Sequence, residues 1–257
     1  ALSGGRINAA TLESISELSS TDRKQLNQFN IPYMSAVYIF FNNSRAPLSD
    51  KNVRNGLIRG IDTDNLRAQL DYPVTSVDSP FLRSHSTYDP TRVQAATSYS
   101  DADALLDTAG WVKVPNSFIR QKDQKPLEFT LLSEDTPDFA RIADVLQKQM
   151  TERGVKLNVD LKEGKEFQRA LLNHEYDALL YGISLGADPD VYAFWHSSQA
   201  VPERFNLSEY KSPVADEALE SGRTRRDVDL RSAKYRPFLD VWSADAPAVG
   251  LYQPRQL

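Results

Sequence analysis

The sequence predicts an α/β fold in which a mixed β-sheet is flanked by helices. Strand and helix patterns alternate through the middle third of the 257 residues, a strong strand pattern precedes them, and two helical patterns with a last strand follow. Such alternation favours parallel strands joined by right-handed crossovers. A content of 40% hydrophobic and 25% charged residues is ordinary for a globular protein and allows a sizeable core.

The first third contains one clear strand and several helices. Residues 1–35 show weak periodicity, and we expect only a short helix there, capped near Ser20 to Asp22 and reaching Gln28. Residues 34–41 are β-branched and aromatic, which predicts a strand. Ser49 or Asp50 caps a helix whose apolar residues recur at helical spacing, and a second short helix is expected at 63–70.

Residues 71–99 are rich in Pro, Ser, Thr and Asp, and their apolar residues recur at neither helical nor strand spacing. We expect a long, partly irregular excursion over the surface. A helix of small residues should follow at 101–109, and Gly110 stands where a glycine in the left-handed conformation would end it.

The middle and last thirds give the clearest patterns. Strands are expected at 127–132, 155–161 and 176–182, separated by helices at 139–150, closed by Gly154, and at 163–173. Two more helices fit 213–223 and 229–243, the second interrupted or kinked by Pro237, which lacks the amide hydrogen of the helical ladder. A closing strand is expected at 248–252.

Composition excludes several functional classes. The chain has no cysteine, which removes disulfides, thiolate metal sites and cysteine nucleophiles. Its 30 basic and 35 acidic residues are mixed along the sequence, so no nucleic-acid partner is expected. No apolar run approaches the length of a membrane span, and the N-terminus lacks the pattern of a signal peptide. The absence of an initiator methionine leads us to expect a processed or excised piece.

The segment from Tyr176 to Ser197 is the most informative about function. Its strand pattern breaks into a loop of small residues, and loops at the ends of strands are where α/β proteins bind ligands. Gly182, Ser184 and Gly186 spell the G-x-S-x-G of a serine hydrolase elbow. The only histidine that follows is His196, twelve residues on, which is awkward for a triad assembled from separate loops.

The same segment also suits a binding loop. Aromatic side chains crowd both sides of the Asp-Pro-Asp sequence at 188–190, and ligand sites are commonly apolar and aromatic with few polar anchors. The three histidines are scattered and lack metal-ligand spacing, so neither a metal nor another cofactor is expected. The candidate ligand-binding residues are Tyr181, Ser184, Leu185, Asp188, Asp190, Tyr192, Trp195 and His196.

Several segments in order resemble the solute-binding proteins of peptide-type ABC importers, extracellular family 5, which includes oligopeptide-, dipeptide- and nickel-binding members. Residues 2–8 look like the family's L-x-x-G-x-I-D step, and 99–111 resemble its segment ending in A-G-W. Further similar segments lie at Tyr38–Asn42, Pro47–Asp50, Val53-Arg54, Ile61-Asp62, Asp188–Asp190 and Asp245–Pro254. The resemblance covers nearly the whole chain but only the C-terminal half of a family member.

The resemblance implies a periplasmic-binding-protein-like (type II) lobe and no enzyme activity. Residues 1–35 would be a hinge or inter-lobe segment, and 36–257 the C-terminal lobe with its return strand. The lobe, expected to be monomeric, would help capture a peptide or related small solute. Its partners would be an ABC permease and ATPase, and the whole protein, lipid-anchored, would work at the extracellular face of the membrane or in the periplasm.

One position departs from the family. Peptide-binding members hold the ligand's α-ammonium with an aspartate where this chain has Leu185, and have a tryptophan where it has Gly182. Peptide is therefore the family's default ligand rather than one that these residues indicate. Two alternatives stay open: a serine hydrolase that uses Ser184, and a receptor or adhesion module whose cleft is filled by its own side chains.

Overall fold

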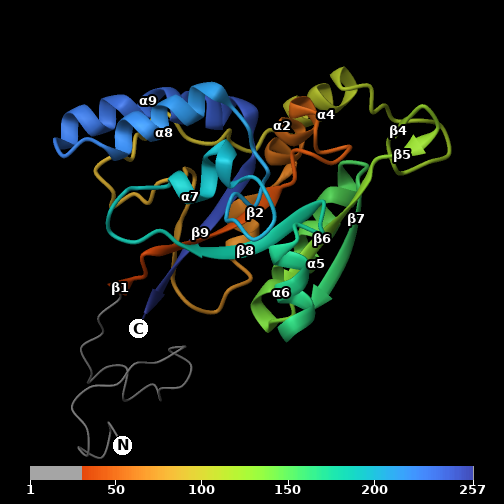
Figure 1. The fold of residues 1–257 in the computed structure, drawn as a ribbon. Helices are drawn as coiled ribbons and strands as arrows, with labels where there is room; N and C mark the ends of the chain where they lie inside the picture. The colour runs from red at the N-terminus through yellow and green to blue at the C-terminus, as the bar shows by residue number, and fades with distance from the viewer. Residues whose placement is uncertain (1–30, 257) are drawn as a thin grey trace, which may run out of the picture.

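A computed structural model of the chain describes residues 31–256. A central sheet of seven strands carries helices on both faces, which confirms the expected α/β architecture (Figure 1). The helix expected near 20–28, and nearly all of the expected hinge segment 1–35, lie outside the described residues.

The sheet is mixed, as the sequence predicts. Its strand order is β1-β9-β2-β8-β6-β7, with β3 also paired to β9. Strand β6 runs parallel to both β7 and β8, whereas β2 runs antiparallel to β8 and β9. The strands are β1 (Ile31–Pro32), β2 (Ser35–Phe41), β3 (Val74–Ser76), β6 (Glu128–Glu134), β7 (Lys156–Lys162), β8 (Ala178–Ser184) and β9 (Ala248–Gln256).

Two hydrophobic cores lie on the two faces of the sheet. Val37, Ile39 and Phe41 of β2 point into one core, and the alternate residues of the strand point into the other. Both faces of β2 are therefore buried, which explains its unbroken apolar sequence. The first core is closed by α2 (Lys51–Gly60), α3 (Thr63–Arg67), α4 (Tyr99–Thr108) and α5 (Pro137–Glu152); the second is closed by α6 (Gly164–Leu172), α7 (Tyr192–Trp195), α8 (Pro213–Arg223) and α9 (Val228–Asp245).

The expected helix boundaries follow from local chemistry. The Asp50 carboxylate accepts a hydrogen bond from the Asn52 amide at the start of α2. Gly110 and Gly154 follow α4 and α5 with φ angles of +86° and +76°, as expected of glycines just past a helix end. These ends could be predicted because each depends on a few adjacent residues.

The segment 71–98 is more tightly packed than expected. It contains β3, which pairs with β9, and it buries Phe81 and Leu82 in the second core. The Tyr38 hydroxyl donates to the Ser79 carbonyl at 2.9 Å, and the Gln94 side chain exchanges two hydrogen bonds with the backbone of Gly250. The segment is irregular outside β3, as expected, but the expectation that it runs over the surface is wrong for its middle part, where Phe81 and Leu82 are buried.

Helix α9 also differs from expectation. It runs from Val228 to Asp245 without the expected interruption at Pro237. Pro237 and Ala233, whose carbonyl loses its helical partner, are both exposed, so water can solvate that carbonyl. Tyr235 before the proline and Phe238 after it are both fully buried, which ties the two halves of the helix to one core.

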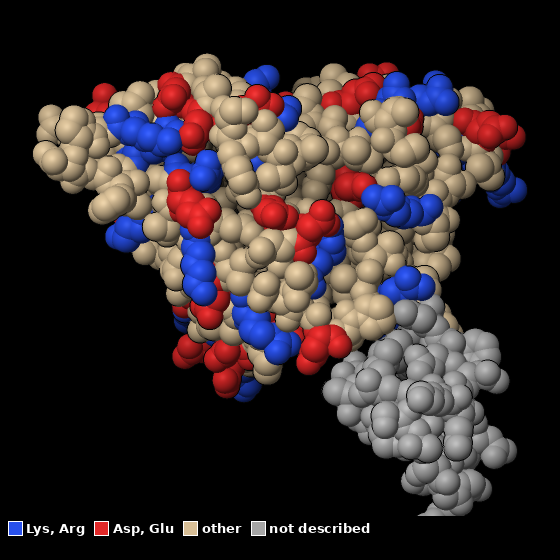
Figure 2. Space-filling model, turned by 180° about the vertical axis from the view of Figure 1, so that it is seen from behind, with Lys and Arg blue, Asp and Glu red and all other residues tan. Residues whose placement is uncertain are grey.

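Smaller features complete the fold. A hairpin of β4 (Gln121–Lys122) and β5 (Lys125–Pro126) protrudes beyond β7, and it was not predicted from sequence (Figure 1). The 3-10 helix η2 (Ser197–Gln199) follows α7. Positive and negative side chains are interspersed over the face in Figure 2, in agreement with the mixed charge of the sequence.

Candidate functional site

The candidate site lies where β6 and β8 end and β2 begins. Parallel strands bring their carboxyl ends to one edge of a sheet, and ligands of open α/β sheets bind beyond that edge. Ser184, the last residue of β8, pairs with Ser35, the first residue of β2. The chain then forms residues 185–191, which we call the β8–α7 loop, before α7 begins.

Backbone hydrogen bonds hold the start of this loop. The amides of Leu185 and Gly186 both donate to the Met34 carbonyl, at 2.8 and 3.2 Å. Gly186 has a φ angle of +67°, which favours glycine at this turn. On its other side, the Gly186 carbonyl lies 2.9 Å from Nε2 of His85.

His85 comes from the packed segment 71–98 and is 6% exposed. Its Nδ1 accepts a hydrogen bond from the Leu82 amide, which leaves Nε2 to donate to Gly186. Burial lowers the pKa of His85, although the hydrogen bond to Gly186 and the charge of Asp188 oppose that shift. The neutral ring is therefore favoured at this contact.

The two aspartates of the Asp-Pro-Asp sequence are bound by arginines. Oδ1 of Asp188 lies 2.6 Å from Nη2 of Arg231 on α9. Oδ2 of Asp190 lies 2.9 Å from Nη2 of Arg223 on α8, and its Oδ1 accepts from the Tyr192 amide at 3.1 Å. Both carboxylates thus face the helices α8 and α9.

The expected aromatic residues fall into different environments. Tyr181 is partly exposed, and its ring packs 5.8 Å from that of Phe167; burial, with the charge of Glu134, raises its pKa. Tyr192 stacks on His196 with ring centroids 4.1 Å apart. Trp195 has 0% exposure and packs edge-on against Trp242, so in this structure it belongs to the core.

Leu185 is likewise buried, at 5% exposure, and joins the second core. Where the resemblance implies a charged anchor, the structure therefore places a packing side chain. Ser184 is exposed at the end of β8. It is the one serine among the eight candidate residues, so its hydroxyl is available to a solute at this edge of the sheet.

The serine hydrolase geometry is not assembled around Ser184. An elbow needs a helix directly after the nucleophile, but seven irregular residues separate Ser184 from α7. Nδ1 of His196 lies 2.8 Å from the Ser198 hydroxyl, and its Nε2 lies 3.3 Å from Glu220. The histidine and acids of the expected triad are therefore engaged elsewhere.

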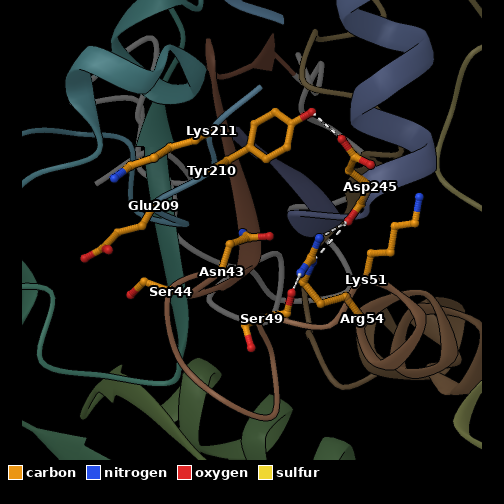
Figure 3. Close-up of a pocket in the computed structure, with 9 residues that line it drawn as sticks. All are labelled: Asn43, Ser44, Ser49, Lys51, Arg54, Glu209, Tyr210, Lys211 and Asp245. Atoms are coloured by element: carbon orange, nitrogen blue, oxygen red, sulfur yellow. Dashed lines mark hydrogen bonds between the residues drawn. The ribbon is translucent and has the colours of Figure 1, made fainter. Parts of the chain in front are cut away.

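A polar cavity of about 520 Å³ lies at the opposite end of β2 (Figure 3). Arg54 in its wall is buried and donates to the carbonyls of Leu48, Ser49 and Asp245, while the Tyr210 hydroxyl donates to the Asp245 carboxylate. These bonds brace the turn after β2 against the end of α9.

Residues 31–256 contain neither a cluster of metal ligands nor a membrane-spanning helix. No group of three His, Asp or Glu side chains there could hold a metal ion. Across that same range, none of the helices has the length and apolar character needed to cross a membrane.

Comparison with known proteins decides the family. The pattern of the bacterial extracellular solute-binding proteins, family 5, middle region, matches residues 1–203. The chain belongs to this family. Oligopeptide-binding protein AppA of Bacillus subtilis is 27% identical over 91% of this chain, and the probable D,D-dipeptide-binding periplasmic protein DdpA of Escherichia coli is 24% identical over 98%.

Solved structures agree on the fold of this family 5 protein. AppA of Bacillus subtilis in complex with a nonapeptide superposes with a TM-score of 0.83 at 26% identity, covering 92% of this chain and 49% of that one. NikZ from Campylobacter jejuni in complex with Ni(L-His) gives 0.80 at 23% identity, covering 99% of this chain and 52% of that one. The chain spans about half the length of the relatives that it matches, 45% of AppA and 47% of DdpA.

Several residues at the site carry no signal in the sequence. Arg223, Arg231, His85 and Phe167 reach the β8–α7 loop or its strand only through tertiary contacts. Arg223 and Arg231 lie more than 30 positions from their aspartates, so no local spacing could have paired them. The position of the loop, in contrast, was predictable because a strand pattern and turn residues mark it.

Proposed function

We propose that this chain is the C-terminal lobe of the substrate-binding component of an ABC importer, which captures a peptide or a related small solute. The observation that carries the proposal is the match to AppA, an oligopeptide-binding protein, in both sequence and fold. The solute would lie against Ser184, Tyr181 and the β8–α7 loop, because they form the carboxyl edge of the sheet.

The partners and location follow from the same relationship. An ABC permease and its ATPase would receive the solute, and the whole protein would work in the periplasm or at the extracellular face of the membrane, held by a lipid anchor. DdpA is itself described as periplasmic. Residues 1–35 and the outer part of β9 would lead to the hinge and the second lobe, since β9 extends beyond β2 to pair with β1 and β3.

The lobe would act by binding rather than by catalysis. The contacts of His196 with Ser198 and Glu220 support this, as do the ion pairs of Asp188 and Asp190 with arginines. A test is turnover of a p-nitrophenyl ester by the two-lobe protein and by its Ser184→Ala variant. We expect the two rates to equal the uncatalysed rate; a rate that disappears in the variant would establish the hydrolase.

Binding is tested by titration calorimetry of the two-lobe protein with a defined peptide mixture, together with mass spectrometry of co-purified solutes. Ser184→Trp should abolish the binding heat, because the large side chain would occupy the exposed strand end. Phe118→Ala is the matched control, since Phe118 is 94% exposed and distant in sequence from the site. Neither heat nor a co-purified solute in the wild type would count against solute capture.

A further inference from the structure

We infer that Arg223 and Arg231 are positioning residues for the solute site: they pin the β8–α7 loop to α8 and α9 through Asp190 and Asp188. These carboxylates would then hold the loop rather than contact the solute. The inference rests on the proposed function insofar as the loop borders the solute, but the pinning itself can be measured without any solute.

One face of α8 holds the segment from Asp190 to Ser197 at three points. Asp216, Glu220 and Arg223 are spaced by four and three residues, which places them in a row along the helix. Asp216 accepts from the Ser197 amide at 2.8 Å, Glu220 lies 3.3 Å from Nε2 of His196, and Arg223 binds Asp190.

Arg223 makes a second contact that strengthens the first. Its guanidinium carbon lies 4.2 Å from the centroid of the Tyr192 ring, within cation–π range. That ring also stacks on His196. Because Asp190 accepts from the Tyr192 amide as well, one arginine fixes both a loop carboxylate and the first residue of α7.

Helix α9 holds the loop at a second point, through the ion pair of Arg231 with Asp188. The Arg231 side chain is 15% exposed, whereas that of Asp188 is 71% exposed, so the arginine is the anchored partner and the loop residue reaches to it. The Arg231 guanidinium also lies 5.8 Å from the centroid of the Tyr235 ring. The largely covered arginine therefore fixes where the exposed part of the loop can lie.

The consequence concerns solute recognition. With both carboxylates paired, the loop brings no free negative charge to a positively charged solute group. The loop offers main-chain groups, and the adjacent end of β8 offers the Ser184 hydroxyl, in a position fixed before binding. A loop fixed in advance loses less conformational freedom when the solute arrives.

The first test measures pinning alone, by amide hydrogen exchange in the two-lobe protein without solute. Arg223→Ala and Arg231→Ala should speed exchange of the hydrogen-bonded loop amides, those of Asp190 and Tyr192, by about tenfold or more, because local opening becomes easier. Arg223→Lys should recover part of the protection. Arg225→Ala is the matched control, an exposed arginine on the same helical hairpin with no ion pair among the described residues. Unchanged exchange in both pin variants would overturn the inference.

The second test separates pinning from direct contact. Each peptide that binds in the calorimetric titration is compared with its N-acetylated form, in the wild type and in Asp188→Asn and Asp190→Asn. Pinning predicts that each variant weakens both forms by the same factor, about tenfold, since a loss of preorganisation does not depend on the ligand's charge. Selective weakening of the free-amine form would show that the aspartate binds the ammonium, and would overturn the inference. If the wild type binds no peptide and carries no co-purified solute, the proposed function fails, while the exchange experiment still decides the pinning.

Discussion

Gly222 of α8 lies directly against the ring of Tyr235 of α9: a β-carbon built on Gly222 would come 2.5 Å from the tyrosine Cε1. This close approach lets the two helices that hold the β8–α7 loop pack against each other. No side chain larger than hydrogen fits at position 222 without moving a fully buried ring.

Gly222→Ala should therefore lower the free energy of unfolding by about 1–3 kcal/mol, even though alanine favours a helix more than glycine does. Urea unfolding measures the change. Gly182→Ala is the control, because a β-carbon there would meet only Val37, at 3.6 Å, an ordinary contact. Equal effects of the two substitutions would contradict the close packing of α8 on α9.

Arg120 should be essential for stability although it lies away from the site. Its side chain has 0% exposure and pairs with Asp103 at 2.7 Å and Asp107 at 2.5 Å. Arg120→Met should cost about 1–3 kcal/mol, because the carbonyls and partly exposed carboxylates around it lose a fully buried donor. Lys113→Met removes an exposed partner of the same Asp103 and should cost less than about 1 kcal/mol. A small effect at Arg120 in chemical denaturation would refute this assignment.

His85 should make stability depend on pH. Burial lowers its pKa in the folded protein below that of the unfolded chain, so the unfolded state binds more protons between the two values. Its contribution is therefore complete above the unfolded pKa of about 6.5 and is lost as pH falls toward the folded value. In His85→Gln, the glutamine amide can donate to Gly186 and accept from Leu82. The variant's urea midpoint should therefore fall less than that of the wild type as the pH is lowered from 8 to 5. An identical pH profile in the variant would argue against the effect.

Trp195 should behave as a core residue rather than as a solute contact. Trp195→Ala should lower the free energy of unfolding by about 3–5 kcal/mol, since it empties a large volume beside Tyr38, Phe40 and Trp242. Phe118→Ala, at a position 94% exposed, should change it by less than about 0.5 kcal/mol. A stable Trp195→Ala protein that had lost only solute affinity would restore Trp195 to the list of binding residues.

Much of the fold could be predicted because its signals are local. The strand at β2 and the helix ends at Asp50, Gly110 and Gly154 each depend on a few adjacent side chains. Pro237 shows the limit of local reasoning, because burial on both sides of it keeps α9 continuous. The packed segment 71–98 shows the same limit, since its order comes from β9 and the second core.

The sequence by itself determined that an α/β protein carries a loop of small residues and aspartates after a buried strand, and it indicated family 5 through ordered segments, which the comparison confirmed. Only the tertiary structure decided what each loop residue does. Trp195 and Leu185 are buried in the core, whereas Ser184 is exposed. Asp188 and Asp190 form ion pairs with arginines on α9 and α8. The physical reason is that burial and charge pairing depend on neighbours distant in the chain, whereas strands, turns and caps depend on neighbours in sequence.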